Sequence, residues 1–336
     1  MKRLCFLVIC MSIIMGCSTS TSSTKALVDY VDPNIGTAHC RWFFYTPAAI
    51  PFGMAKLAPS TDAHLGNPGG WQAVGYDFRH TSIEGFANFH EFQVGGVVFA
   101  PTVGELQTVP GELENPDGGY RSRFDKKDEV AAPGYYSVLL KDYGVKAELT
   151  AMKRVGFHRY TYPKTELANL IFDIGNKQGE SGEVKDAEVQ YFEDGRVEGY
   201  VITSPVYVNI YQKGADVRMY FSAVLNKKPV QVGTFVKDVV NPGKHQEKGP
   251  GAGLYMTFST EEQEAVEVKV GLSYTSIENA RFNRETEAAD VTFDQAKKNA
   301  TDVWNESLSR IYVEGGKETD KVKFYTGLFH ALLGRG

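Results

Sequence analysis

The sequence is poor in cysteine, with four cysteines among 336 residues. Cys5 and Cys10 lie in an apolar N-terminal stretch, and Cys17 follows that stretch directly. Only Cys40 remains in the body of the chain. A framework of disulfides is therefore excluded, and a hydrophobic core has to stabilise the fold. We expect Cys40 to be a buried apolar thiol without a chemical role.

The chain also lacks basic runs. It carries 36 Lys and Arg against 41 Asp and Glu, which gives a formal net charge of −5. An acidic surface without basic clusters repels nucleic acid and anionic lipid, so we exclude nucleic acid as a partner. An uncharged glycan is compatible with this composition.

No apolar run is long enough to cross a bilayer comfortably. Leu4–Ile14 is too short for that and follows Lys2 and Arg3, which is the pattern of an export signal. The tetrapeptide Ile14-Met15-Gly16-Cys17 resembles a bacterial lipobox, in which a small residue precedes the cysteine. We predict a signal peptide over 1–16, cleavage before Cys17 and lipidation of that residue.

This lipid would anchor the protein to a membrane of the bacterial cell envelope, facing the periplasm or the cell surface. The alternative is an ordinary secretory signal with an incidental cysteine. Residues 17–28 are rich in Ser and Thr and are expected to form a flexible tether.

Residues 29–273 are predicted to form one β domain. Apolar and polar residues alternate with a period of two at Val145–Ala151 and Val266–Leu272, as in half-buried strands. The many short strand candidates and 34 glycines favour a large antiparallel β-sandwich, so the fold class is mainly β. The other strand candidates are Leu167–Ile174, Val206–Tyr211, Val217–Val224 and Val230–Val236.

A hairpin is expected where Glu188–Glu193 and Arg196–Ile202 flank the dipeptide Asp194-Gly195. This dipeptide is typical of a type I′ turn, which needs a positive φ at both central residues.

The pattern changes to helical after Ser273. Thr292-Phe293-Asp294-Gln295 fits a capping box, in which the first and last side chains satisfy free backbone N–H groups. A short strand is possible at Arg310–Glu314, before a break at Gly315-Gly316. The first helix stripe is Phe293, Ala296, Ala300, Val303, Trp304 and Leu308; the second is Val322, Tyr325, Phe329 and Leu332. We expect the second stripe to have no partner in this sequence.

Several motifs together resemble glycoside hydrolase family 92, the calcium-dependent exo-acting α-mannosidases. They are Tyr30–Thr37, Ile50–Thr61, Pro133–Val138, Gly271–Ala280 and Lys323–Leu333, and the resemblance extends from about Asp29 to Gly336. It implies a β-sandwich, a helical linker and an (α/α)6 barrel, with hydrolysis of α-mannosides by inversion. On this basis 29–273 is the sandwich, 274–316 the linker and 317–336 the first helix of a barrel that is otherwise missing.

Inverting hydrolysis needs two carboxyl groups about 6.5–9.5 Å apart. In the family that the chain resembles, the barrel supplies both of them and most ligands of the calcium ion. We therefore predict no catalytic residue and no metal ligand in this chain, and expect no calcium to be fully coordinated by it. Asp77, Glu84 and Glu91 are not expected to act as general acids.

The resemblance implies that loops of the sandwich contact the sugar, within Gly69–Phe78 and Gly85–Gly96. Aromatic rings stack on the apolar faces of sugars, and polar side chains bind the hydroxyls around them. The predicted substrate-binding residues are Trp71, Tyr76, His90 and Glu91. The structural alternatives are a plug at the end of the sandwich for Trp71, a core or interface position for Tyr76, a hydrogen-bonded structural histidine at His90, and a solvated or loop-capping Glu91.

The chain departs from the usual family pattern, Gly-Phe-Ser-His-x-His-x-Ser-Gly. One histidine is retained as His90, whereas Asn88 replaces the other. This difference puts the linkage specificity in doubt. The aromatic run Trp42–Tyr45 either lines a subsite or packs against the barrel, and we favour packing.

We therefore predict the carbohydrate-contacting N-terminal domain of an exo-acting inverting α-mannosidase, inactive alone. The predicted partners are an α-mannoside glycan, the missing catalytic barrel and, through Cys17, a membrane. The alternative is a non-catalytic glycan-binding surface lipoprotein. A purely structural envelope protein would explain the lipobox but none of the motifs.

Overall fold

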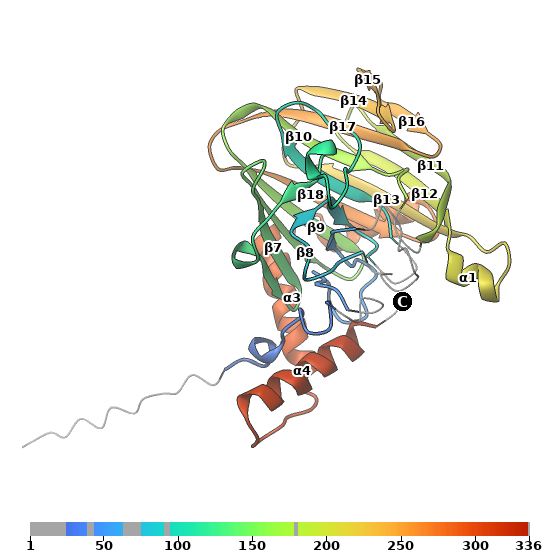
Figure 1. The fold of residues 1–336 in the computed structure, drawn as a ribbon. Helices are drawn as coiled ribbons and strands as arrows, with labels where there is room; N and C mark the ends of the chain where they lie inside the picture. Colours follow the sequence, from blue (N-terminus) through green and yellow to red (C-terminus); the bar gives the residue numbers. More distant parts are fainter. Residues whose placement is uncertain (1–24, 39–43, 63–74, 91–94, 178–180, 335–336) are drawn as a thin grey trace, which may run out of the picture.

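The computed structural model describes residues 25–38, 44–62, 75–90, 95–177 and 181–334. Two antiparallel sheets pack face to face (Figure 1). The mainly β fold class and the antiparallel sandwich are thereby confirmed. Among the described residues, no helix is long and apolar enough to span a bilayer.

The smaller sheet has seven strands. In spatial order they are β1 (Ala58–Ser60), β3 (Gly85–Ala87), β4 (Val98–Val103), β10 (Thr165–Asp173), β17 (Ala252–Thr260), β14 (Gln231–Val236) and β15 (Val239–Pro242). A separate two-stranded ribbon joins β2 (Ser82–Ile83) to β5 (Ser122–Arg123).

The larger sheet has nine strands and carries α2 (Ile277–Ala288) and α3 (Phe293–Leu308) on its outer face. In spatial order its strands are β16 (Gln246–Lys248), β11 (Glu183–Tyr191), β12 (Val197–Ser204), β13 (Val217–Leu225), β18 (Glu264–Ser273), β9 (Val155–Tyr162), β8 (Val145–Ala151), β7 (Tyr135–Leu140) and β6 (Val130–Ala132). The helices are α1 (Val206–Tyr211), α2 (Ile277–Ala288), α3 (Phe293–Leu308) and α4 (Glu318–Leu333), and the short 3-10 helices are η1 (Leu27–Tyr30), η2 (Pro116–Gly118) and η3 (Lys126–Asp128).

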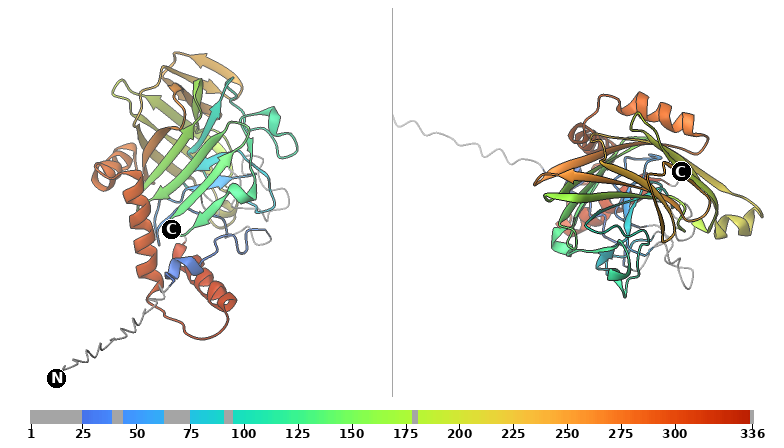
Figure 2. Two further views of the ribbon diagram at one scale, coloured as in Figure 1. Left: turned by 90° about the vertical axis from the view of Figure 1, so that its left-hand side faces the viewer. Right: turned by 90° about the horizontal axis from the view of Figure 1, so that it is seen from above.

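The alternation of apolar and polar residues in the sequence predicted correctly which side chains of the strands face the core. In β18, Val266, Val268 and Val270 are buried in the core between the sheets. Lys269 lies between them in the sequence and points to the outer face, where its Nζ donates to the Ala288 carbonyl at the end of α2 (3.0 Å). Figure 2 shows α2 and α3 against this outer face.

The hairpin between β11 and β12 is confirmed, but the predicted turn type is wrong. Gly195 has a φ of +88°, whereas Asp194 does not have a positive φ. The Gly195 N–H donates to the Phe192 carbonyl (2.9 Å), and the Phe192 N–H donates to the Arg196 carbonyl (2.9 Å). This arrangement fits a three-residue loop that ends in a bulge. One glycine is enough for it, because only the last loop residue needs the left-handed conformation.

The strand predicted at Val206–Tyr211 is wrong, because this segment forms the helix α1. The helix begins after Pro205 and projects from the sandwich, and no strand of the described residues pairs with it (Figure 1). The Asn209 amide donates to the carbonyls of Pro205 (2.8 Å) and Ala215 (3.1 Å), and these bonds hold the turn together. Apolar β-branched residues form a strand only where a neighbouring strand exists.

The strand considered at Arg310–Glu314 is also absent, and this segment is a loop. The hydroxyl group of Tyr325 forms hydrogen bonds with this loop that a neighbouring strand would otherwise form. It accepts a hydrogen bond from the Val313 N–H (3.2 Å) and donates one to the Ile311 carbonyl (3.3 Å).

The capping box of α3 is confirmed in both directions. The Gln295 N–H donates to the Thr292 hydroxyl (3.3 Å), and the Thr292 N–H donates to the Gln295 side chain (2.8 Å). The predicted stripe of α3 is buried except for Val303, which is 36% exposed. Its first turns pack on β7 and β9, and Trp304 packs on α4.

The expectation that the stripe of α4 lacks a partner in the chain is wrong. Tyr325 and Phe329 are buried against α3 and against the N-terminal segment that contains Tyr45 and Ala49. The rings of Trp304 and Phe329 lie 4.6 Å apart, and the Trp304 indole N–H donates to the Ala49 carbonyl (2.7 Å). We call this group of residues the helix cluster; its buried members are Val28, Tyr45, Ala49, Ala58, Tyr76, Trp304, Leu308, Tyr325, Phe329 and Leu333.

The helix cluster gives a first testable prediction. Trp304→Ala removes a fully buried indole and its hydrogen bond, so we expect it to lower the free energy of unfolding by about 3–5 kcal/mol. Urea denaturation followed by circular dichroism measures this change. Val303→Ala, one position earlier and partly exposed, is the control and should cost about 1 kcal/mol or less. Equal losses in the two variants would show that the cluster does not hold α3 in place.

Candidate functional site

The candidate site lies where two N-terminal segments meet the end of α4. Within these segments, Ala48 bridges to Leu57 and Lys56 bridges to Phe89. The Phe52 N–H donates to the Leu332 carbonyl at the end of α4 (3.1 Å). We call residues 44–62 and 75–90 together the wall. It contains two of the four predicted sugar contacts, Tyr76 and His90.

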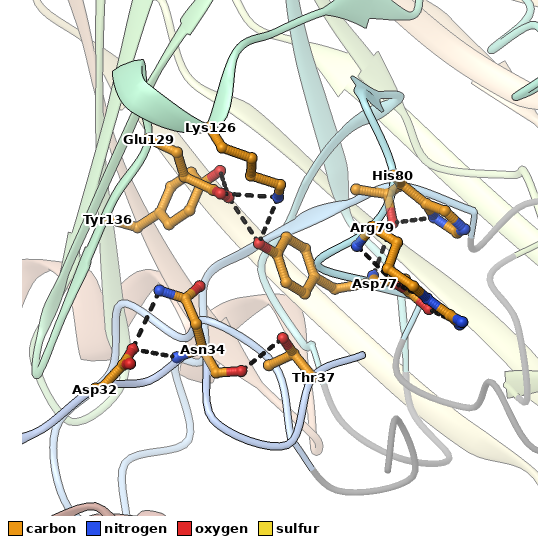
Figure 3. A network of polar contacts seen from close by, with 11 residues as sticks. Asp32, Asn34, Thr37, Asp77, Arg79, His80, Lys126, Glu129 and Tyr136 are labelled. Carbon is orange, nitrogen blue, oxygen red and sulfur yellow. Dashed lines mark hydrogen bonds and ion pairs between the residues drawn. The ribbon is translucent and has the colours of Figure 1, made fainter. Parts of the chain in front are cut away.

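Tyr76 is fully buried, which is the placement that its core alternative predicts. Its hydroxyl group donates to the Glu129 carboxylate (2.8 Å) and accepts from the Lys126 ammonium (3.1 Å). Tyr136 donates to the same Glu129 oxygen (2.8 Å), and Figure 3 shows Lys126, Glu129 and Tyr136 converging. Burial, with the charge of Glu129, raises the pKa of Tyr76 far above its ordinary value. The phenol therefore stays protonated and anchors the wall; its contact with a sugar stays a prediction.

His90 has a different environment. It is 3% exposed, and its ring stacks on that of Tyr45 with centroids 4.5 Å apart. Its backbone N–H donates to the Lys56 carbonyl (3.0 Å), which fixes the main chain. Neither ring nitrogen has a hydrogen-bond partner among the described residues. Burial lowers the pKa of His90 to about 4, against weaker opposing effects of the Pro59 carbonyl and the Glu84 charge.

The His90 imidazole is therefore neutral at pH 7, with one donor and one acceptor nitrogen. Buried polar atoms without partners are rare in folded proteins, and each calls for an explanation. The interaction with the Pro59 carbonyl and the backbone hydrogen bond to Lys56 fit the structural alternative for His90, so both interpretations stay predictions. The ring nitrogens of His90 are candidates for binding a ligand, as is the Ser60 hydroxyl, which also lacks a partner among the described residues.

Asn88 points into the core and not into the wall. Its amide donates to the Val97 carbonyl (2.6 Å), and its carbonyl oxygen lies 2.8 Å from Nε2 of His158. Nδ1 of His158 lies 2.8 Å from the hydroxyl group of Tyr160, so the three side chains form a buried polar chain. The departure from the family pattern at this position thus concerns the inside of the sandwich.

Buried charged side chains lie within the wall and next to it, and the sequence analysis assigned them no role. Arg121 is 2% exposed, pairs with Glu84 (3.0 Å) and donates to the Thr61 carbonyl (2.6 Å). Asp77 receives two hydrogen bonds from the Arg79 guanidinium (3.0 and 2.8 Å; Figure 3). These carboxylates hold the loops of the wall through paired, charge-assisted hydrogen bonds.

Lys56 was also missed. It is 2% exposed, and its Nζ donates to the Gly334 carbonyl just beyond α4 (2.9 Å). The sequence does carry a signal, because Lys56 is a single charge inside the apolar run Met54–Ala58. A buried ammonium needs partners, so such a lysine predicts a polar contact within the core.

Several predicted residues lie outside the described part of the chain: Trp71, Glu91, Cys17, Cys40, Trp42 and Phe43. The rest of the aromatic run is described. Phe44 stacks on His330 of α4 with ring centroids 4.2 Å apart, and Tyr45 stacks on His90. These two rings pack within the chain itself.

The described residues do not fit a calcium site. No group of three or more His, Cys, Asp and Glu side chains among them is placed to hold a metal ion. Calcium takes six to eight oxygen ligands, whereas the buried carboxylates Asp77 and Glu84 face the guanidinium groups of Arg79 and Arg121.

Two family models match the sequence. That of the glycosyl hydrolase family 92 N-terminal domain matches residues 30–273, and that of the family 92 catalytic domain matches residues 279–336. No protein of curated function matches the chain.

Among solved structures, the family GH92 alpha-mannosidase BT3965 of Bacteroides thetaiotaomicron is 30% identical in sequence, with a TM-score of 0.83, over 92% of this chain and 41% of that one. Its complex with mannoimidazole matches with the same identity and TM-score, over 92% and 40%. The family GH92 inverting mannosidase BT2199 of the same organism is 22% identical with a TM-score of 0.76, over 93% and 40%, and shows the likeness of fold alone. The chain thus spans about two fifths of the length of these structures.

The buried histidines predict a dependence of stability on pH. Burial also lowers the pKa of His158, to about 3. Because both folded-state values lie below the value of about 6.5 in the unfolded chain, the unfolded chain binds more protons in mild acid. The stabilisation is complete above about pH 6.5 and is lost as the pH falls toward the folded-state values. We expect up to about 1.4 kcal/mol of loss per pH unit for each histidine.

Urea denaturation at several pH values between 7 and 5 measures this slope. His90→Gln should remove the share of one histidine, and the parent protein measured under the same conditions is the reference. The prediction fails if His90→Gln and the parent protein have the same slope.

Proposed function

Because the chain belongs to glycoside hydrolase family 92, we propose that it forms the carbohydrate-contacting wall of an exo-acting inverting α-mannosidase. The likeness to an α-mannosidase over nearly the whole chain is the observation that carries this proposal. The relative's complex with mannoimidazole supports a mannose-type sugar as the ligand.

His90 supplies the chemistry of the wall in this proposal. A neutral imidazole donates with one nitrogen and accepts with the other, so either nitrogen can bind a sugar hydroxyl. Its burial against Tyr45 keeps it neutral and fixes the plane of its ring. Trp71 and Glu91 are proposed to complete the wall, with the indole stacked on an apolar face of the sugar.

The two carboxyl groups of inverting hydrolysis are proposed to lie outside this sequence. One has to protonate the leaving oxygen, and the other has to activate a water molecule. Asp77 and Glu84 are poor candidates, because each is buried in an ion pair with an arginine. The calcium ion of the family is likewise proposed to be held by groups of the catalytic barrel.

An activity assay tests the proposal. We expect the 336-residue chain to release no mannose from an α-mannobioside, with or without added calcium, and to bind the disaccharide in the millimolar range by calorimetry. His90→Leu should weaken this binding by up to about tenfold, since a hydrogen bond to the sugar is lost. His245→Leu is the matched control and should bind normally.

Release of mannose by the chain alone would refute the proposed division of labour. The absence of binding at high ligand concentration would refute the sugar-contacting wall. Binding without hydrolysis also fits a non-catalytic glycan-binding lipoprotein. Addition of a separately produced family 92 catalytic domain distinguishes the two, because only a mannosidase subunit should then support hydrolysis.

We also propose that the protein is exported and anchored through a lipid on Cys17. The N-terminal lipobox supports this, and several acyl chains on one residue bind a membrane firmly. Cys17→Ser should therefore abolish labelling by radioactive palmitate in a bacterial host and move the protein from the membrane fraction to the soluble one. Labelling of the Cys17→Ser variant would contradict this proposal, and Cys40→Ser serves as the control.

A further inference from the structure

A cavity of about 320 Å³ lies between the outer face of the nine-stranded sheet and the end of α2. It is separate from the wall and is built from β13, β18 and α2, which Figure 2 shows packed together. Its volume falls in the range of small-molecule sites. Most of the exposed lining is apolar, and the apolar residues are Val224, Leu225, Ala288 and Ala289.

Arg284 provides the unusual feature of this cavity. It lies where α2 packs closely on the sheet, because a Cβ on Gly271 would meet the Ala280 carbonyl at 2.1 Å and Cβ of Arg284 at 2.7 Å. Its side chain is 8% exposed, lines the cavity and has no hydrogen-bond partner for Nε within the described part of the chain. Its guanidinium pairs with the neighbouring Glu285 (3.1 Å), whose side chain is 61% exposed.

The nearby buried carboxylate cannot neutralise Arg284, because other groups already occupy it. Both oxygens of Glu198 accept from Arg281 (2.7 and 2.6 Å), and one also accepts from Ser222 (2.7 Å). Arg196 approaches the same carboxylate at 3.0 Å. Burial, with the charges of Arg196 and Arg281, lowers the pKa of Arg284, against the charges of Glu285 and Glu198.

Arg284 is therefore a buried guanidinium beside an apolar floor, and its ion-pair partner Glu285 is exposed. A buried guanidinium without a buried counter-charge is costly, and a bound anion would relieve that cost. We propose that this cavity binds a small aliphatic monocarboxylate, with its carboxylate on Arg284 and its hydrocarbon chain on Val224 and Ala288. Planar carboxylates match the donor geometry of a guanidinium group.

The charged residues around the cavity favour a ligand with a single negative charge. Glu267 lines the same cavity, and Glu285 lies on its rim. Lys269 does line the cavity, but its ammonium donates to the carbonyls of Ala288 (3.0 Å) and Ala289 (3.2 Å). A doubly charged phosphate would be repelled by the two glutamates, and a neutral amide would leave the guanidinium charge without a partner.

Butyrate is the probe, and chemical-shift titration of the intact chain is the measurement. We expect saturable binding of butyrate, about tenfold weaker binding of butyramide and no saturable binding of inorganic phosphate. Arg284→Met should abolish butyrate binding. Arg310→Met, at an exposed arginine between α3 and α4, is the matched control and should leave it unchanged.

Ala289→Trp provides a second test that leaves Arg284 in place. Ala289 is exposed at the mouth of the cavity, so a bulky ring there should block entry without disturbing the core. Loss of butyrate binding in this variant supports the site even if Arg284→Met does not fold. The proposal is overturned if butyrate does not bind the parent protein, if Arg284→Met still binds it, or if phosphate binds equally well.

Discussion

The hydrogen bond from the Trp304 indole to the Ala49 carbonyl, inside the helix cluster, is the contact on which the rest of the arrangement depends. It joins α3 to the N-terminal segment, and α4 packs on the same indole through Phe329. β1 and β3 join part of the wall to the seven-stranded sheet, and the helix packing fixes the segment around Ala49. The buried contact of Lys56 with the carbonyl after α4 adds a second fixed point. The position of the wall therefore depends on the sheet and on the packing of α3 and α4.

The fold could be predicted where a residue's environment depends on its immediate neighbours. In β8 and β18 the side chains alternate between a core and an outer face, so the pattern alone identifies the strand. The capping box of α3 is equally local. Prediction failed at α1, because β-branched residues do not reveal whether a neighbouring strand exists. It failed at Arg310–Glu314 for the same reason, since a tyrosine hydroxyl group there replaces the missing strand.

The candidate site was predicted less completely, because its contacts join distant segments. The resemblance pointed to His90 and Tyr76, but only the structure separates their environments: Tyr76 is bonded to Glu129, whereas the ring nitrogens of His90 have no partner among the described residues. The ion pair of Arg121 with Glu84 crosses 37 positions of sequence, and no local pattern encodes such a pair. Charged residues within apolar runs, such as Lys56, are the signal that can be read in advance.

The distance in sequence between the two ends of the fold has a consequence for its synthesis. Trp304 and Ala49 are 255 positions apart, and Asp32 and Thr326, which are hydrogen-bonded, are 294 apart. Contacts of this kind form late and slow the folding of a chain. At roughly 5–20 residues per second, the ribosome needs on the order of 10–50 seconds to reach Trp304 after Ala49. During that interval the aromatic side chains of the nascent N-terminal segment lack their cover, and a chaperone that shields them would prevent aggregation.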